Sequence, residues 1–241
     1  MKILIIELKK EKRYGIILLM FAIGILGAAY AFLNFAVRKE ALLSLPLAPM
    51  TILLTQLYGM MMTLNLFGII VAACMIYSME FKDCAVKKMY MLPVHVPAMY
   101  LCKFLILTVL LSIAITLQDL ALTKIGITNL PGGSFELHTL IRFALYAFIT
   151  AMPVLSFMLF IASRFENMWI SLGIGVAGFL SGMALGVPKI GLFLADPFVI
   201  MLKPAVSMST RPDVAVIAIA IVETLLFLAA GLWTSSNIHY E

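Results

Sequence analysis

Residues 78–103 read SMEFKDCAVKKMYMLPVHVPAMYLCK, and this polar stretch separates two long apolar runs. Its many charged side chains exclude it from hydrocarbon, where an unpaired ion is costly. Residues 78–91 contain no proline or glycine and predict a short helix, which Pro93 and Pro97 then end. We therefore expect a membrane protein in which a short cytosolic helix is held between two membrane spans.

The composition of the whole chain supports a membrane protein. Of its 241 residues, 63% are hydrophobic and 12% are charged, and the mean hydropathy is +1.10. Soluble domains contain about 45–50% apolar and about 25% charged residues. No polar stretch is long enough to build a soluble domain, so the sequence predicts one all-α, polytopic membrane domain over residues 1–241.

Six apolar segments are long enough to cross a bilayer. Residues 1–13 precede them as an expected interfacial helix with a basic end. Residues 188–213 are largely apolar around Asp196 but too short to cross, which predicts a broken, re-entrant pair of short helices on the outer side. The expected spans are residues 15–36, 52–77, 98–121, 140–161, 168–187 and 214–234.

The distribution of lysine and arginine predicts the orientation. Basic residues gather before the first span and after the second, and such segments stay in the cytosol. We expect both ends of the chain and the 78–91 helix to be cytosolic. Lys103, at the start of the third span, is expected to extend its ammonium group to the inner interface.

Several motifs accompany this layout. Residues 7–10 form a Glu-x-x-Lys pattern, and Glu80 precedes Lys87-Lys88, Leu92-Pro93 and Lys103 around the first cytosolic loop. The chain resembles the permeases of ABC-2 type transporters, most similarly those of lantibiotic-immunity and bacitracin-type peptide exporters. The likeness covers nearly the whole chain in layout. At the level of motifs it rests on Glu7, Lys10, Glu80, Pro93 and Lys103.

In that family the first cytosolic loop is a coupling helix that docks onto an ATPase subunit. The resemblance implies an ATPase partner, a second permease chain that is identical or homologous, and export of an amphipathic peptide or lipid-like molecule. It also implies a bacterial plasma membrane location. The expected ATPase-coupling residues are Glu80, Phe81, Lys87, Lys88 and Met89. The alternative for this stretch is an ordinary basic loop that only tethers two spans.

The sequence contains none of the common catalytic motifs. It lacks G-x-x-x-x-G-K-[ST], so ATP hydrolysis is expected on a separate subunit. The three cysteines and three histidines do not have metal-ligand spacing, and no pair of carboxylates stands at catalytic spacing. We therefore expect a chain that is not an enzyme, needs no cofactor or metal, and binds no nucleic acid.

Glu223 is a carboxylate near the centre of the sixth span. A charged carboxylate there costs about 2.5–3.5 kcal/mol, so Glu223 is expected to be protonated, paired or facing a polar cavity. Asn65 and Gln56 are its possible partners within the membrane. Both a structural and a transport role remain open, and the latter gives the alternative function of a proton-coupled secondary transporter.

The fifth span carries Gly178, Gly182 and Gly186 at four-residue spacing. Small residues at this spacing let another helix approach closely. This pattern predicts either packing within the chain or contact with a second subunit.

Overall fold

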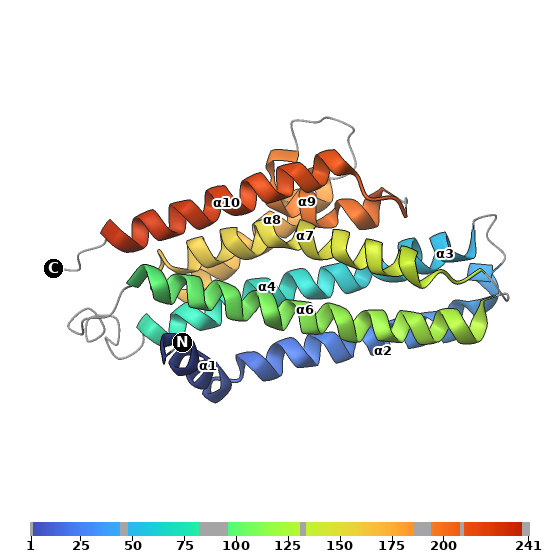
Figure 1. Ribbon diagram of the computed structural model, residues 1–241, viewed down its shortest axis with the longest axis horizontal. Helices are drawn as coiled ribbons and strands as arrows, with labels where there is room; N and C mark the ends of the chain where they lie inside the picture. The colour runs from blue at the N-terminus through green and yellow to red at the C-terminus, as the bar shows by residue number, and fades with distance from the viewer. Residues whose placement is uncertain are drawn as a thin grey trace.

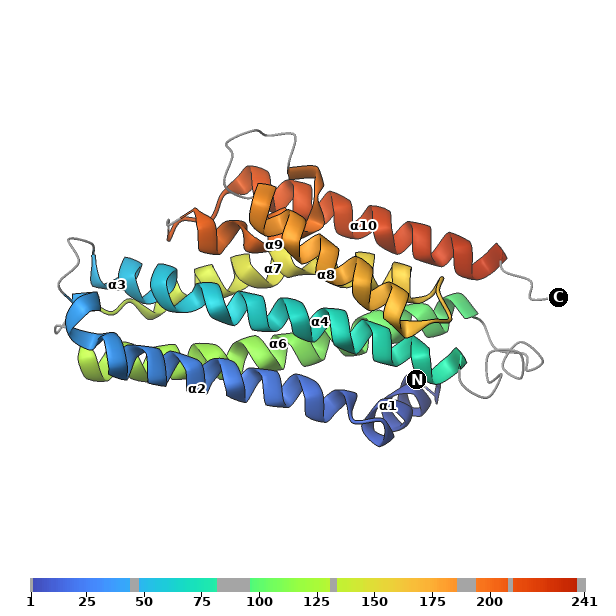
Figure 2. The same ribbon diagram turned by 180° about the vertical axis from the view of Figure 1, so that it is seen from behind.

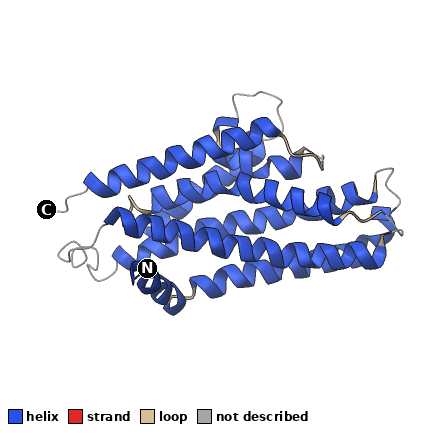
Figure 3. Ribbon diagram, in the orientation of Figure 1, coloured by secondary structure: helices blue, strands red, loops and turns tan. Residues whose placement is uncertain are grey.

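The computed structural model describes residues 2–43, 48–81, 96–130, 134–185, 194–207 and 210–237. Nearly all of these residues are helical, and the described parts contain no strand (Figure 3). Six helices of the described residues are long and apolar enough to cross a membrane. The structure therefore confirms the predicted all-α class and the number of spans.

A short helix, α1, lies across the end of the bundle and leads into the first span (Figure 1). The chain turns between the two at Gly15, whose φ of +80° is readily adopted only by glycine. The second span is built from three consecutive helical pieces, one of them a π-helix turn. The elements are α1 (Lys2–Arg13), α2 (Ile16–Leu43), α3 (Pro49–Ile52), the π-helix η1 (Leu53–Leu57), α4 (Tyr58–Phe81) and α6 (Val96–Asn129).

In the described residues of its second half, the chain contains three spans and one short α-helix, α9. Asp196 caps α9, because its carboxylate accepts a hydrogen bond from the backbone N–H of Phe198 at 2.9 Å, and Pro197 suits the first turn. Within residues 188–213 the described part holds this one short helix, largely buried against α7 and α8 (Figure 2). The elements are α7 (Leu137–Ala162), α8 (Met168–Leu185), α9 (Pro197–Val206) and α10 (Val214–Asn237).

The second span forms the centre of the bundle. Its most apolar window is 61% buried, whereas the windows of α8 and α10 are each only 17% buried. α2 packs on α4 and α6, while α10 packs mainly on α7 (Figure 1). A displacement of α4 would therefore be transmitted to the helices packed around it throughout the core. α8 and α10, in contrast, present most of their side chains to the surroundings of the bundle.

The bounds of several helices differ from those expected. α6 continues to Asn129, beyond residue 121 where the third span was expected to end, because Leu122 and Ile125 are buried and the Phe135 ring packs on Gly126. α2 continues past residue 36 to Leu43, with a bend at Arg38. Tertiary packing, which hydropathy does not report, stabilises these extra turns.

The start of the expected coupling helix also differs. Residues 78–81 form the last turn of α4, so this part is continuous with the second span and is not a separate helix. Residues 82–91 lie outside the described residues. α1, the end of α10 and the flanks of residues 82–95 lie at the same end of the bundle (Figure 1), as an even number of spans requires.

Candidate functional site

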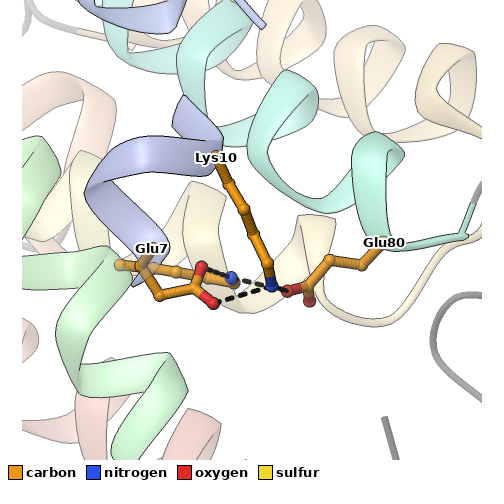
Figure 4. A network of polar contacts seen from close by, with 4 residues as sticks. Glu7, Lys10 and Glu80 are labelled. Atoms are coloured by element: carbon orange, nitrogen blue, oxygen red, sulfur yellow. Dashed lines mark hydrogen bonds and ion pairs between the residues drawn. The ribbon is translucent and has the colours of Figure 1, made fainter. Parts of the chain in front are cut away.

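An ionic cluster of Glu7, Lys10, Glu80 and Lys103 lies where α1, α4 and α6 meet (Figure 4). The Lys103 ammonium donates to Glu7 Oε2 at 2.5 Å and to Glu80 Oε1 at 2.7 Å. Lys10, one turn after Glu7 on α1, donates to Glu7 Oε1 at 2.9 Å and lies 3.9 Å from Glu80 Oε1. Two carboxylates and two ammonium groups thus join three helices.

The central members of the ionic cluster are removed from water. Lys103 and Glu7 are each 1% exposed, and Glu80 is 7% exposed. The Tyr77 ring centroid lies 5.8 Å from Lys103 Nζ, within range of a cation–π contact. Removing one partner from such a buried network typically costs about 3–5 kcal/mol, because it leaves an uncompensated charge. The ionic cluster therefore holds its three helices in one arrangement.

Two carboxylates of α1 respond in opposite ways to this environment. Burial raises the pKa of Glu7, but the attraction and hydrogen bonds of Lys103 and Lys10 outweigh burial, so the pKa of Glu7 is lowered. Burial raises the pKa of Glu11 to about 8, with repulsion from Glu7 and Glu80 adding to the effect. Glu11 is fully buried, and neither of its oxygens has a hydrogen-bond partner among the described residues.

The ionic cluster brings together four of the five residues on which the family resemblance rests; Pro93 lies outside the described residues. Two expectations are corrected. The Lys103 ammonium is not exposed, as a side chain extended to the interface would be, but is buried within the protein, where Glu7 and Glu80 neutralise it. Glu80 was expected on a cytosolic helix, among the residues that couple to an ATPase, but its carboxylate points inward to Lys103 and is buried. Sequence separation hid this: Lys103 is 96 positions from Glu7.

Of the remaining expected coupling residues, the structure describes Phe81, which follows Glu80 of the ionic cluster. Phe81 ends α4, is half-buried, and stacks at 6.4 Å, in a tilted geometry, against the Tyr77 ring. It lines a hollow of about 680 Å³ together with Met75, Met79 and Trp169, here called the Phe81 hollow. Methionine and aromatic walls suit an adaptable apolar contact. Lys87, Lys88 and Met89 lie outside the described residues.

The intramembrane polar residues pair differently from the expectation. Asn65 and Gln118 exchange two hydrogen bonds of 2.9 Å between α4 and α6, and both side chains are buried. Asn65 is therefore not the partner of Glu223, and Gln56, half-buried in η1, makes no hydrogen bond to Glu223 in the described structure. Gln118 was not expected as the partner of Asn65; the one signal for it is an amide inside an apolar run.

Glu223 is 8% exposed on α10. Its Oε2 atom is buried and has no hydrogen-bond partner in the part of the chain that the structure describes. The Asp196 carboxylate is close enough to repel it, although Asp196 is itself held by Ser181 at 2.8 Å and by the backbone of α9. The structure thus offers Glu223 a negative neighbour in place of the expected amides.

The glycines of α8 pack within the chain. A side chain at Gly178 would overlap the Phe198 ring of α9, and one at Gly182 would be in tight contact with the Cβ and backbone of Phe198, so these glycines let α9 approach α8 closely. The prediction of packing within the chain is confirmed for this pair, and Gly186 lies outside the described residues. Gly173 on the same helix has open space around it.

No group of three histidine, cysteine, aspartate or glutamate side chains in the described residues could hold a metal ion. The ionic cluster itself is made of pairs that neutralise one another. Its geometry fits a mechanical role, which is to fasten helices, better than binding of an ion.

The fold defines a polytopic helical membrane protein, in which the ionic cluster joins α1, α4 and α6 at one end of the bundle. Residues 3–182 match the model of the ABC-2 family transporter proteins. This match includes α1, the first four spans and most of α8, and with them all members of the ionic cluster. The chain therefore belongs to the ABC-2 transporter family, as a permease and not a catalytic subunit. No curated protein matches the chain.

Proposed function

We propose that this chain is the permease subunit of an ATP-driven exporter, and that a separate ATPase subunit docks at the end of the bundle that carries the ionic cluster. The observation that carries the proposal is the position of this cluster. It fastens α1, the end of α4 and the start of α6, and so holds both flanks of residues 82–95. Force applied to this segment would pass directly into α4, the central helix of the core.

The proposed coupling residues have different roles. Glu80 acts inside the chain, where it positions the end of α4 through Lys103. Phe81 and the apolar wall of the Phe81 hollow offer the contact surface, and Trp169 extends this surface with 70% of its area exposed. Lys87, Lys88 and Met89 are proposed to complete the docking segment.

The partners and substrate are proposed on the same basis. Two permease chains, identical or homologous, would surround the transport path, with the sparsely covered α8 and α10 available for lipid or for the second chain. The substrate is an amphipathic peptide of lantibiotic type or a lipid-like molecule, exported across a bacterial plasma membrane. The ionic-cluster end faces the cytosol, together with both ends of the chain.

Orientation is tested by labelling single cysteines in a cysteine-free variant. Glu166→Cys and Glu136→Cys both place the thiol at an exposed position, one after the end and one before the start of the membrane-spanning helix α7. We expect an impermeant thiol reagent to label position 136 in intact cells and position 166 only after the membrane is opened. The opposite pattern would place the docking end outside and end the proposal.

The docking itself is tested by co-purification from native membranes with an affinity-tagged chain. A bound ATPase with a P-loop, identified by mass spectrometry, and ATP hydrolysis by the purified complex are the expected results. Trp169→Ala should reduce the amount of ATPase recovered, whereas Trp233→Ala is the matched control, because Trp233 is 69% exposed on α10 and away from the Phe81 hollow. Absence of an ATPase from the wild-type complex would refute the proposal.

Glu223 supports a second candidate, a proton-coupled secondary transporter. The supporting observation is its buried, unpartnered Oε2 atom in the sixth span. Glu223→Gln keeps the shape of the side chain but cannot release a proton. Two results together would favour the second candidate over the first. The Glu223→Gln variant would lose transport at a normal protein level, and the wild type would transport on a proton gradient without ATP.

A further inference from the structure

A groove with a volume of about 380 Å³ lies between α6 and the first half of α7. Its floor includes Asp119, which follows Lys103 by 16 positions on the same helix. An α-helix rises about 1.5 Å per residue, so Asp119 lies about 24 Å along the helix axis from Lys103 of the ionic cluster. In a bilayer whose hydrocarbon core is about 30 Å thick, Asp119 is therefore in the half opposite to the ionic cluster. We call this feature the Asp119 groove.

One wall of the Asp119 groove is a polar stripe on α6. Ser112, Thr116, Asp119 and Thr123 recur every three or four residues, so they share one helical face. Each hydroxyl already donates its hydrogen to a carbonyl of its own helix, at 2.7 Å for Ser112 and Thr116 and 2.8 Å for Thr123. The hydroxyl oxygens can therefore only accept, and the stripe offers acceptors without donors.

The carboxylate in this stripe is not neutralised by the protein. Asp119 Oδ1 is buried without a hydrogen-bond partner, and no lysine or arginine of the described chain forms an ion pair with Asp119. The Tyr58 hydroxyl lies close enough to Asp119 to interact with it, but the two do not form a hydrogen bond of good geometry, and a neutral hydroxyl would not balance the charge of the carboxylate. An ionisable group in a membrane span normally has a functional reason, and its missing partner is a cation or a donor.

The other wall of the groove is apolar and open to the side. Leu137, Ile141 and Leu145 of α7 line it and are 52%, 50% and 56% exposed. Ser112 and Thr123 are eleven positions apart, so the groove runs for about 16 Å along the bundle. A lipid-like chain can enter from the membrane and lie along this wall.

We propose that the Asp119 groove binds a single-chain amphiphile with an ammonium head group. The ammonium lies at Asp119 and donates to the acceptor stripe, and the alkyl chain packs against α7. Charge complementarity favours this ligand, because the Asp119 carboxylate would repel an anionic head, which would also find no donor in the stripe, and a neutral head would leave the charge of the carboxylate uncompensated. That this is a transported substrate rests on the proposed function, whereas binding does not.

The test uses photoreactive dodecylamine and dodecanol with the same diazirine at the end of the chain. The purified chain is labelled in neutral maltoside detergent without any ATPase, and the labelled peptides are identified by mass spectrometry. We expect the amine to label residues of α7 that line the groove, and the alcohol to label them about tenfold less. Because no ATPase is present, this result is independent of the co-purification experiment on the docking end.

Variants separate the site from general partition into detergent. Asp119→Asn should reduce labelling by the amine about tenfold and leave the alcohol unchanged, and Ala144→Phe should fill the groove and reduce both. Ile113→Phe is the control, because Ile113 lies on α6 at 38% exposure but does not line the groove. If Asp119→Asn does not fold, the comparison of amine with alcohol on the wild type decides. Equal labelling by both probes, or no labelling because a second copy covers the groove, would overturn the proposal.

Discussion

Replacement of Lys103 by methionine tests whether the ionic cluster fastens α1 to the bundle. Methionine has a similar length and fits an apolar interior, so packing is largely kept while the charge is lost. The change removes the hydrogen bonds of 2.5 Å to Glu7 and 2.7 Å to Glu80. Glu7 keeps Lys10 at 2.9 Å, but among the described residues the nearest remaining ammonium group to Glu80 is that of Lys10, 3.9 Å away. Glu80 therefore becomes the carboxylate without adequate compensation.

The magnitude follows from this geometry. Breaking a buried ion pair costs about 3–5 kcal/mol. Since Lys10 still serves Glu7, we expect the lower part of this range, about 3 kcal/mol. For a chain of this size, each kcal/mol lowers the unfolding midpoint by about 2–4 °C, so the Lys103→Met variant should unfold about 6–12 °C below the wild type.

The assay is thermal unfolding of the purified chain in maltoside detergent, followed by circular dichroism. Lys124→Met is the matched control, because it removes an exposed lysine from the same helix. Adding Glu80→Gln to Lys103→Met should recover most of the loss, since it removes the uncompensated carboxylate. A midpoint for Lys103→Met equal to that of Lys124→Met, or no recovery in the double variant, would refute a stabilising role for the ionic cluster.

Three further outcomes are expected. Because the pKa of Glu11 is about 8 in the folded chain against an ordinary 4.5, the folded state holds a proton that the unfolded state has released. Stability should thus fall as pH rises from about 4.5 to about 8, and Glu11→Gln should flatten this slope in unfolding midpoints measured across that range. Gly178→Ala should destabilise the folded chain by about 1–3 kcal/mol, because the added methyl group overlaps α9. Gly173→Ala, in open space on the same helix, should be neutral or stabilising by up to about 1 kcal/mol. Equal unfolding midpoints for the two variants would contradict this. Gln118→Leu should cost about 1–3 kcal/mol by orphaning Asn65, and adding Asn65→Leu should restore part of the loss unless the two amides act independently.

Much of the candidate site could be proposed from sequence only as single residues. The motif residues Glu7, Glu80 and Lys103 were recognisable, but their contact was not, because they come from three helices far apart in the chain. Their side chains were expected in water or at the interface, since an isolated charge is most stable there. Mutual neutralisation changes that balance, and it depends on which helices meet.

The Asp119 groove and the burial of Glu11 were likewise not predictable from the sequence. Nothing in the pattern around Glu11 distinguishes it from the exposed charges beside it, yet helix packing buries it completely. In the sequence, Asp119 stands two positions before the end of the expected span 98–121, and only the position of α7 makes it part of a groove.

The sequence by itself determined the class of the protein, the six spans and the membership of residues 3–182 in the ABC-2 family. These follow from hydropathy and local motifs, and each apolar segment must satisfy its backbone hydrogen bonds within its own helix in a membrane. Only the tertiary structure decided which polar groups meet: Glu7 with Lys103, Asn65 with Gln118, and Glu223 without either expected amide. The physical reason is that the energy of a buried polar group depends on partners from other helices, and those partners are fixed by packing.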